Sequence, residues 1–188
     1  MRNVEIHPLT ADRWGDFEKL FGPRGASGGC WCMFWRLRSS VNAKNTGADN
    51  KRAMKRIIDS GEPPGLLAYV DGEPVGWCSI DIRENFARIQ RSRTLKRIDD
   101  RPDVWSLNCF VIAKEHRRHG LMTALLDAAV EYARKRGAKV IEAYPIEPGG
   151  DLKSYHGYTG IASTFRRRGF REVARPRENQ SIMRKELG

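Results

Sequence analysis

The residues best suited to chemistry form one short basic loop, Arg117-Arg118-His119-Gly120, which Leu121 and Met122 follow directly. A glycine lets the backbone come close to a ligand, and the flanking arginines and histidine add positive charge. If a helix begins at residue 121, its first N–H groups have no partner within the helix and point toward one spot. The loop is therefore suited to an anion such as a pyrophosphate. The alternative is an ordinary turn between a strand and a helix, with hydrated basic side chains.

The neighbouring sequence predicts the elements that position this loop. Residues 104–112 are mostly apolar, as in a buried strand, and residues 139–144 form a second such run before Pro145. Between them, apolar residues recur at helical spacing from 121 to 133, and Gly137 follows as a stop signal. The order strand, helix, strand predicts two parallel strands joined by the helix 121–136.

Three segments, in order along the chain, resemble the GCN5-related N-acetyltransferases (GNAT). Residues 117–121 resemble the family's acyl-CoA-binding motif Gln/Arg-x-x-Gly-x-Gly/Ala, with Met122 at the last position. Residues 140–142 resemble the family's fifth strand. Residues 165–170 resemble its Tyr-x-x-x-Gly-Phe element, with Phe165 in place of the tyrosine. The resemblance is good over residues 66–187 and looser over the first sixty.

The resemblance implies an α/β (α+β) fold with a mixed, mostly antiparallel central sheet flanked by helices. A length of 188 residues and 40% hydrophobic content suit a single core. We therefore expect one GNAT-like domain over residues 1–188. Residues 1–65 would supply acceptor-side helices and a loop, and residues 66–188 the cofactor-binding core.

The activity that this family implies is transfer of an acetyl group from acetyl-CoA, as co-substrate, to a primary amine that attacks it directly, with no metal. The resemblance places Phe110, Val111 and Ile112 along the pantetheine arm, where the fourth strand splays from the fifth and backbone N–H groups, more than side chains, serve the oxyanion. The residues expected around the pyrophosphate are Arg117, Arg118, His119, Gly120, Leu121 and Met122.

Such a transfer needs a neutral amine, a stabilised oxyanion and a protonated leaving thiolate. The resemblance makes Glu142 the candidate base; its alternative roles are to orient the acceptor or to satisfy a backbone donor. Because Phe165 has no proton to give, Tyr155, Tyr158 or Ser163 is expected to act as the acid. Otherwise the thiolate leaves unassisted, since a thiol pKa of about 8.5 makes it a fair leaving group.

Residues 30–36 are rich in aromatic and sulfur-containing side chains. In the family's layout the segment after the first strand covers the acceptor site, which makes Trp31 and Trp35 candidate acceptor-binding residues. A Cys-x-Cys pair begins this segment, but the other two cysteines are isolated in predicted strands, so the spacing is poor for zinc. Buried free thiols are the favoured interpretation.

The rest of the chain predicts further elements from periodicity and turn signals. We expect a polar, basic loop over residues 81–101. Near the end of the chain we expect two strands that complete the sheet, joined by a turn containing Pro176. The expected strands are 4–6, 66–70, 75–80, 170–174 and 181–185, and the expected helices are 14–21, 49–60 and 161–168.

The formal net charge is +11, concentrated in residues 83–101 and 166–185. A basic surface suits steering of an anionic cofactor, binding of nucleic acid, or simple hydration. Because no RNA-binding fingerprint or zinc module is present, nucleic-acid binding is the alternative rather than the favoured function, and a non-catalytic acyl-CoA sensor is another. With no signal peptide and no apolar run long enough to span a bilayer, we expect a cytoplasmic protein without membrane contact. A homodimer is left open.

Overall fold

A seven-stranded mixed sheet forms the centre of the molecule, in the order β1-β2-β3-β4-β5-β7-β6. The computed structural model describes residues 3–95, 97–147 and 158–188. Neighbouring strands are antiparallel except β4 and β5, which are parallel, as the strand–helix–strand order predicts. The strands are β1 (Val4–Pro8), β2 (Gly65–Val70), β3 (Glu73–Ile82), β4 (Val104–Ile112), β5 (Val140–Ala143), β6 (Arg171–Arg177) and β7 (Gln180–Glu186).

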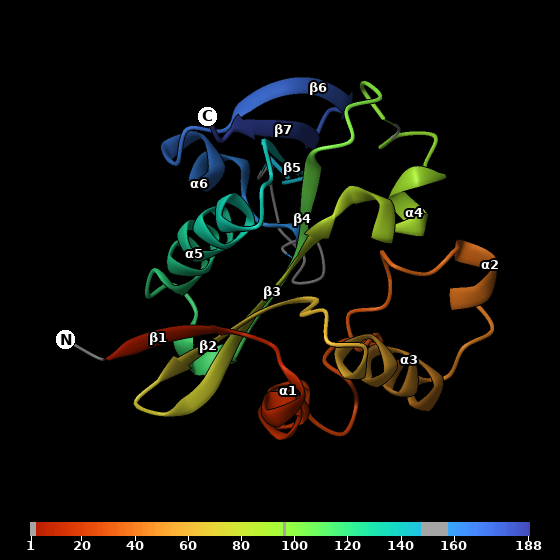
Figure 1. Cartoon of the computed structure of the whole chain (residues 1–188), viewed down its shortest axis with the longest axis vertical. Helices are drawn as coiled ribbons and strands as arrows, with labels where there is room; N and C mark the ends of the chain where they lie inside the picture. The colour runs from red at the N-terminus through yellow and green to blue at the C-terminus, as the bar shows by residue number, and fades with distance from the viewer. Residues whose placement is uncertain (1–2, 96, 148–157) are drawn as a thin grey trace.

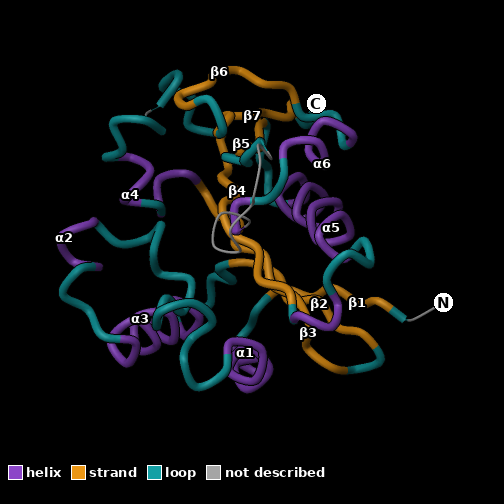
Figure 2. Tube along the Cα trace, turned by 180° about the vertical axis from the view of Figure 1, so that it is seen from behind, coloured by secondary structure: helices purple, strands orange, loops and turns teal. Residues whose placement is uncertain are grey.

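Helices cover both faces of the sheet (Figures 1 and 2). Helices α5 and α6 lie on one side, and α1 to α4 lie on the other. Their bounds are α1 (Trp14–Phe21), α2 (Ser39–Asn42), α3 (Gly47–Asp59), α4 (Ala87–Gln90), α5 (Leu121–Lys135) and α6 (Ala162–Arg167). This architecture confirms the predicted mixed α/β fold.

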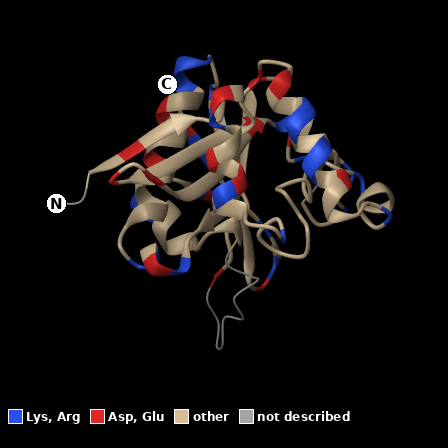
Figure 3. Ribbon diagram, turned by 90° about the horizontal axis from the view of Figure 1, so that it is seen from below, with Lys and Arg blue, Asp and Glu red and all other residues tan. Residues whose placement is uncertain are grey.

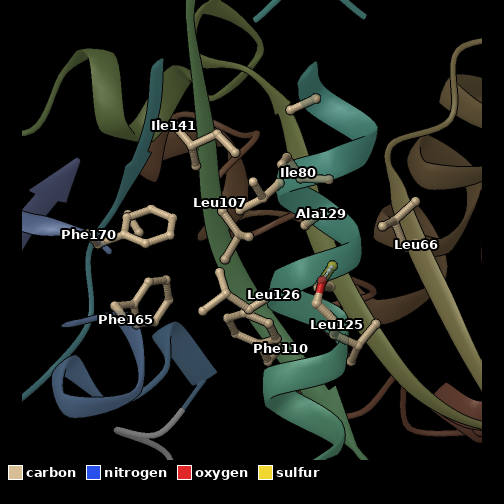
Figure 4. Close-up of a cluster of buried hydrophobic side chains, with 14 of the residues drawn as sticks. Leu66, Ile80, Leu107, Phe110, Leu125, Leu126, Ala129, Ile141, Phe165 and Phe170 are labelled. Carbon is tan, nitrogen blue, oxygen red and sulfur yellow. Dashed lines mark hydrogen bonds between the residues drawn. The ribbon is translucent and has the colours of Figure 1, made fainter. Parts of the chain in front are cut away.

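Helix α5 joins β4 to β5 and packs its apolar stripe on the sheet (Figure 4). Leu125, Leu126 and Ala129 are fully buried against strand residues such as Ile80 and Leu107. The first turns of α5 lie close to the sheet because β3 has a glycine there. A Cβ added at Gly76 would lie 3.1–3.2 Å from side-chain atoms of Leu121, Leu125 and Ala68.

A second core lies on the opposite face, between the sheet and α1 and α3. Its large members are aromatic, with Phe17 between Phe21 and Trp77 at ring-centroid distances of 4.0 and 5.1 Å. Helix α3 is held at its start by a capping box between Thr46 and Asp49. Both cores support the middle of the sheet, where β3 and β4 lie.

Strands β4 and β5 separate part of the way along β4. Their pairing ends at Leu107 opposite Ala143, whereas β4 continues to Ile112. On its other edge β4 has a bulge, because Ser79 pairs with Cys109 and Ile80 with Leu107. Asn108 is therefore the extra residue of the bulge, directly after the last pair with β5.

Two sequence-based expectations differ from the structure. The segment 81–101 is not wholly irregular: it contains the end of β3, a 3-10 turn at Arg83–Asn85 and α4. The predicted turn at Pro176 is wrong, since Pro176 lies inside β6 and the turn follows at residues 178–179. Strand β6 is at the edge of the sheet and its pairing is irregular around Pro176, so a residue without an N–H is tolerated there.

Candidate functional site

The basic loop leads directly into α5 and presents a row of backbone donors. Arg118 and Gly120 both have positive φ angles, 64° and 81°, which alternate with ordinary residues. Among the hydrogen bonds of the described residues, none uses the backbone N–H groups of residues 118–122. Such an alternation forms a concave nest of N–H groups at the positive end of a helix. The geometry fits a pyrophosphate.

The side chains of this loop leave the nest open. Arg117, Arg118 and His119 are exposed, and Nε of Arg117 donates to the Ile112 carbonyl oxygen at 3.0 Å, which ties the loop to the end of β4. No atom lies within 4 Å of the position that a Cβ of Gly120 would take. Leu121 is buried in the core.

Met122 turns its side chain away from the loop and toward α6. Its Cε lies 2.8 Å from the position that a Cβ on Gly160 would occupy, next to the ring of Phe165. A methionine at this position of the motif is therefore compatible with free backbone donors.

Beyond the separation from β5, β4 supplies the residues predicted to follow the pantetheine arm. Phe110 is buried and packs edge-on against Phe165 at 6.2 Å, whereas Val111 and Ile112 are half-buried. Asn108, at the bulge, is fully buried, and within the described part of the chain neither amide atom has a hydrogen-bond partner. Beyond Leu107, β4 therefore no longer pairs with β5, and a buried amide without a hydrogen-bond partner lies where the pairing ends.

A cavity of about 310 Å³ opens beside this part of β4, on the side of α1 and α3. Its wall includes Cys109 and Val111 of β4, Tyr158 and Thr159 after β5, and Trp35. None of the described residues that line it is an aspartate, glutamate, lysine or arginine. A mostly apolar cavity at this position is suited to a small molecule with an apolar body.

The structure brings only one of the two predicted acceptor tryptophans to this cavity. Trp35 lines it, whereas Trp31 is buried against Phe21 and Trp14 at ring-centroid distances of 5.8 and 6.3 Å. Trp31 faces a different surface hollow, where the ammonium of Lys51 lies 5.0 Å from its ring. The acceptor-binding role assigned to Trp31 stays a prediction.

Three cysteines also line the cavity, and all are free thiols. The indole N–H of Trp77 donates to Sγ of Cys32 at 3.1 Å. Donation from the Cys109 thiol, then from Trp77, together with the positive charge of Arg36, lowers the pKa of Cys32 to about 7 against the opposing effect of burial. The pKa of Cys109 is raised well above its ordinary value, because its proton is held in the hydrogen bond to Cys32 and because it is buried. Burial raises the pKa of Cys30.

The carboxylate of Glu142, the predicted base, lies in β5 and is 1% exposed. The Tyr144 hydroxyl donates to Oε1 at 2.7 Å and lies 3.0 Å from the Ser106 hydroxyl. Burial and the neighbouring carboxylate raise the pKa of Tyr144 well above its ordinary value, so it keeps its proton.

The second oxygen of Glu142 is bound by arginines. Nε of Arg184 lies 2.8 Å from Oε2, and Arg83 lies 3.5 Å from the same atom. Arg184 also binds Asp99 and holds the pKa of that carboxyl below its usual range. Glu142 is therefore the centre of a network that joins β5 to β7 and to residues 83–99. It does not belong to the lining of the cavity.

Of the candidate acids, the structure describes Tyr158 and Ser163; Ser163 is half-buried in α6 and is not among the residues that line the cavity. Tyr158 is half-buried at the cavity wall, next to Thr159. Tyr155 lies outside the described residues. Phe165, at the position of the family's tyrosine, is fully buried between Phe110 and Phe170.

Residues that sequence reasoning did not assign to the site include Cys32, Cys109 and Thr159. The sequence holds one signal for Cys109: it lies two residues before Val111 in β4, which is the spacing of side chains on one face of a strand. The approach of Cys32 to β4 depends on tertiary packing.

About half of the described basic residues in the two basic stretches form ion pairs with acidic residues. Arg101 binds Asp103 and Glu186, and Arg175 binds Glu172 and Glu147. Lys and Arg segments alternate with Asp and Glu segments over the ribbon of Figure 3. In addition, no described helix has the length and apolarity needed to cross a bilayer.

Solved structures of low sequence identity share this fold. The PaiA N-acetyltransferase from Thermoplasma acidophilum, in complex with coenzyme A, is 14% identical with a TM-score of 0.58, over 98% of this chain and 99% of its own. YncA from Salmonella typhimurium, with its cofactor acetyl-CoA, is 13% identical with a TM-score of 0.58, over 98% and 94%. The ribosomal-protein-alanine N-acetyltransferase from Brucella melitensis is 19% identical with a TM-score of 0.55, over 97% and 99%.

No curated protein matches the sequence significantly. Residues 34–159, more than half of the chain, match the acetyltransferase (GNAT) family. This match includes β4, the basic loop, α5 and β5, which are the elements that build the site described above. The chain therefore belongs to the GNAT acetyltransferase family.

Proposed function

We propose that the protein transfers an acetyl group from acetyl-CoA to a primary amine, which attacks the thioester directly. The observation that carries the proposal is the open nest of N–H groups at the start of α5, which lies at the end of β4 where β4 has separated from β5. Two structural neighbours contain coenzyme A or acetyl-CoA, which supports the same ligand here.

In this proposal Arg117, Arg118, His119 and the backbone of residues 120–122 hold the pyrophosphate. The pantetheine arm follows residues 110–112 toward the bulge at Asn108. There the β4 backbone beyond its pairing with β5 stabilises the developing oxyanion, next to the buried and unsatisfied Asn108 amide. The acceptor occupies the cavity between β4, Trp35 and Tyr158.

The proton acceptor has two candidates. Glu142 is the candidate from sequence, acting directly or through a water. Its oxygens are already bound by Tyr144 and Arg184, which favours a role in holding β5 and β7 together. Cys32 lines the cavity itself and is the candidate from structure. For the leaving thiolate, Tyr158 is the candidate acid because it lines the cavity.

The alternative, a non-catalytic acyl-CoA sensor, would bind the same ligand without turnover. Nucleic-acid binding is less favoured because intramolecular ion pairs occupy much of the basic surface. We separate these functions by titrating acetyl-CoA calorimetrically and then incubating protein and acetyl-CoA with a panel of primary amines. Formation of an N-acetylated amine, seen by mass spectrometry, supports the proposal. Binding without product supports a sensor, and the absence of binding contradicts both.

A further inference from the structure

Cys32 is held in a strained turn with its sulfur at the cavity. Trp31 and Cys32 both have φ in the left-handed region, 45° and 59°, which is costly for residues with a Cβ. The turn is fixed because the Trp31 indole packs on Gly25, where an added Cβ would lie 2.3 Å from Nε1 of Trp31. The sulfur of Cys32 is thereby placed between Trp77 and the cavity.

The polar surroundings of Cys32 consist of donors. The indole N–H of Trp77, on β3, donates to Sγ of Cys32 at 3.1 Å, and the thiol of Cys109, on β4, is a second donor to the same sulfur. Arg36 supplies positive charge, although its guanidinium is also paired with Asp81 at 2.8 Å. The Ser79 hydroxyl, on β3 opposite Cys109, has no hydrogen-bond partner among the described residues, and Cys30 is the other thiol of the turn. Such an arrangement stabilises a thiolate, and it lowers the pKa of Cys32 toward neutrality.

An independent observation indicates that the cavity receives a polar ligand group. Thr159 is 8% exposed and lines the cavity, yet its hydroxyl has no hydrogen-bond partner among the described residues. An unsatisfied buried hydroxyl costs about 1–3 kcal/mol, which a ligand donor or acceptor offsets. Apart from Ser27 and the three cysteines, the rest of the described wall is apolar or aromatic, and no described carboxylate lines it.

We propose that Cys32 is a catalytic thiolate of the acceptor site, which binds the ammonium form of an amine with an apolar body and accepts its proton. This inference rests on the proposed function and names both its base and its substrate class. A thiolate is the one anionic group that the described lining offers to an ammonium.

Two protons leave the nitrogen during the reaction. The ammonium gives one proton to Sγ of Cys32, and the neutral nitrogen forms a bond to the acetyl carbon. The bond between that carbon and the sulfur of CoA breaks, and the second nitrogen proton leaves with the CoA thiol. Cys32 then releases its proton to water. An alkylammonium has a pKa of about 10 in water, and desolvation in an apolar cavity lowers it toward that of the thiol.

The first test is independent of catalysis. Ultraviolet absorbance of the thiolate, followed against pH in the free protein, should show a thiolate forming near pH 7. The rise in absorbance near pH 7 should be missing in Cys32→Ser. It should be retained in Cys78→Ala, which removes a buried thiol from the α5 side of the sheet. A wild-type protein that forms no thiolate below about pH 8.5, the ordinary thiol range, overturns the inference.

The second test uses 2-phenylethylamine as the acceptor. In wild-type protein, kcat/KM should rise with pH around 7, as the thiolate forms, and fall near the amine's pKa of about 10. Cys32→Ser and Cys32→Ala should both lose about 100-fold or more at pH 7, and their rising limb should move to the amine's pKa. The doubly charged 1,4-diaminobutane should be a poorer acceptor, since its second ammonium would contact apolar wall.

The outcomes separate this inference from the proposed function. Acetyl transfer with an unchanged rising limb in folded Cys32→Ser overturns the role of Cys32 and leaves the acetyltransferase intact. A wild-type protein that titrates near pH 7 but acetylates no amine overturns the proposed function, and this inference with it.

Discussion

At Gly120 the backbone has a φ of 81°, and the space where a side chain would begin is open. Gly120→Val places a branched side chain in the concavity that we assign to the pyrophosphate. We expect wild-type acetyl-CoA affinity to be roughly micromolar, about 8 kcal/mol, and the variant to lose at least about tenfold, or about 1.4 kcal/mol. Isothermal titration calorimetry measures both values.

Gly137 offers a matched control, because it follows the same helix with a φ of 87° and equally open space. Gly137→Val should lose a similar amount of stability, about 1–2 kcal/mol, with unchanged acetyl-CoA affinity. Equal affinities in wild type and Gly120→Val would refute the assignment of the loop.

Glu142→Gln distinguishes a base from a structural ion pair. Because the change leaves Arg184 without a charged partner in β5, we expect the free energy of unfolding to fall by about 3 kcal/mol. Turnover of the folded variant should stay within about tenfold of wild type, whereas loss of a general base would cost about two to four orders of magnitude. Denaturant unfolding and steady-state turnover give the two numbers.

The control for this change is Glu147→Gln, which removes one carboxylate from the more exposed cluster with Arg166 and Arg175. Such pairs contribute about 0–1 kcal/mol. If Glu142→Gln were as stable as Glu147→Gln but nearly inactive, Glu142 would be the base.

On the scale of elements, the contact between α5 and β3 sets the position of the nest. Gly76→Val would push on Leu121 and Leu125 in the first turns of α5, and overpacking of this kind costs about 1–3 kcal/mol. We expect a lower thermal midpoint and weaker acetyl-CoA binding together.

Gly15→Ala provides the contrast, since Gly15 lies in α1 with nothing within 4 Å of its added Cβ. Alanine favours a helix over glycine by up to about 1 kcal/mol, so this variant should be as stable as wild type or more so. Unaltered acetyl-CoA binding in Gly76→Val would show that the nest does not depend on this packing.

The elements themselves were predictable where their signal is local. The apolar spacing of α5 and the Asp71-Gly72 turn between β2 and β3 each depend on residues that are close together in the sequence. The bulge at Asn108 was not predictable, because it depends on the register of β4 against β3. Pro176 predicts a turn from the sequence alone, because the sequence does not show that β6 is an edge strand.

The same distinction applies to the site. The loop 117–122 was predictable, since its glycine and basic residues are contiguous. The partners of Glu142 were not, because Arg83 and Arg184 lie 59 and 42 residues away in the chain. The approach of Cys32 to Trp77 spans 45 residues and depends on the strained turn at residues 31–32.

On the scale of the whole molecule, the net charge of +11 is spread over a surface with many ion pairs. The basic residues that concern the proposed function are Arg117 and Arg118, in the loop before α5 beside the end of β4; neither has an acidic partner in the described part of the chain. Long-range attraction of an anionic cofactor to this side is expected to weaken with ionic strength.

Acetyl transfer from acetyl-CoA bound at the loop before α5 is tested most directly by the stoichiometry of the products formed from acetyl-CoA and 2-phenylethylamine, quantified by mass spectrometry. We predict that free CoA and N-acetylated amine appear in equal amounts with wild-type protein, and that both are lost in Gly120→Val but not in Gly137→Val. CoA release without acetylated amine would contradict transfer to the amine. A yield of acetylated amine in Gly120→Val equal to that of wild type would contradict cofactor binding at this loop.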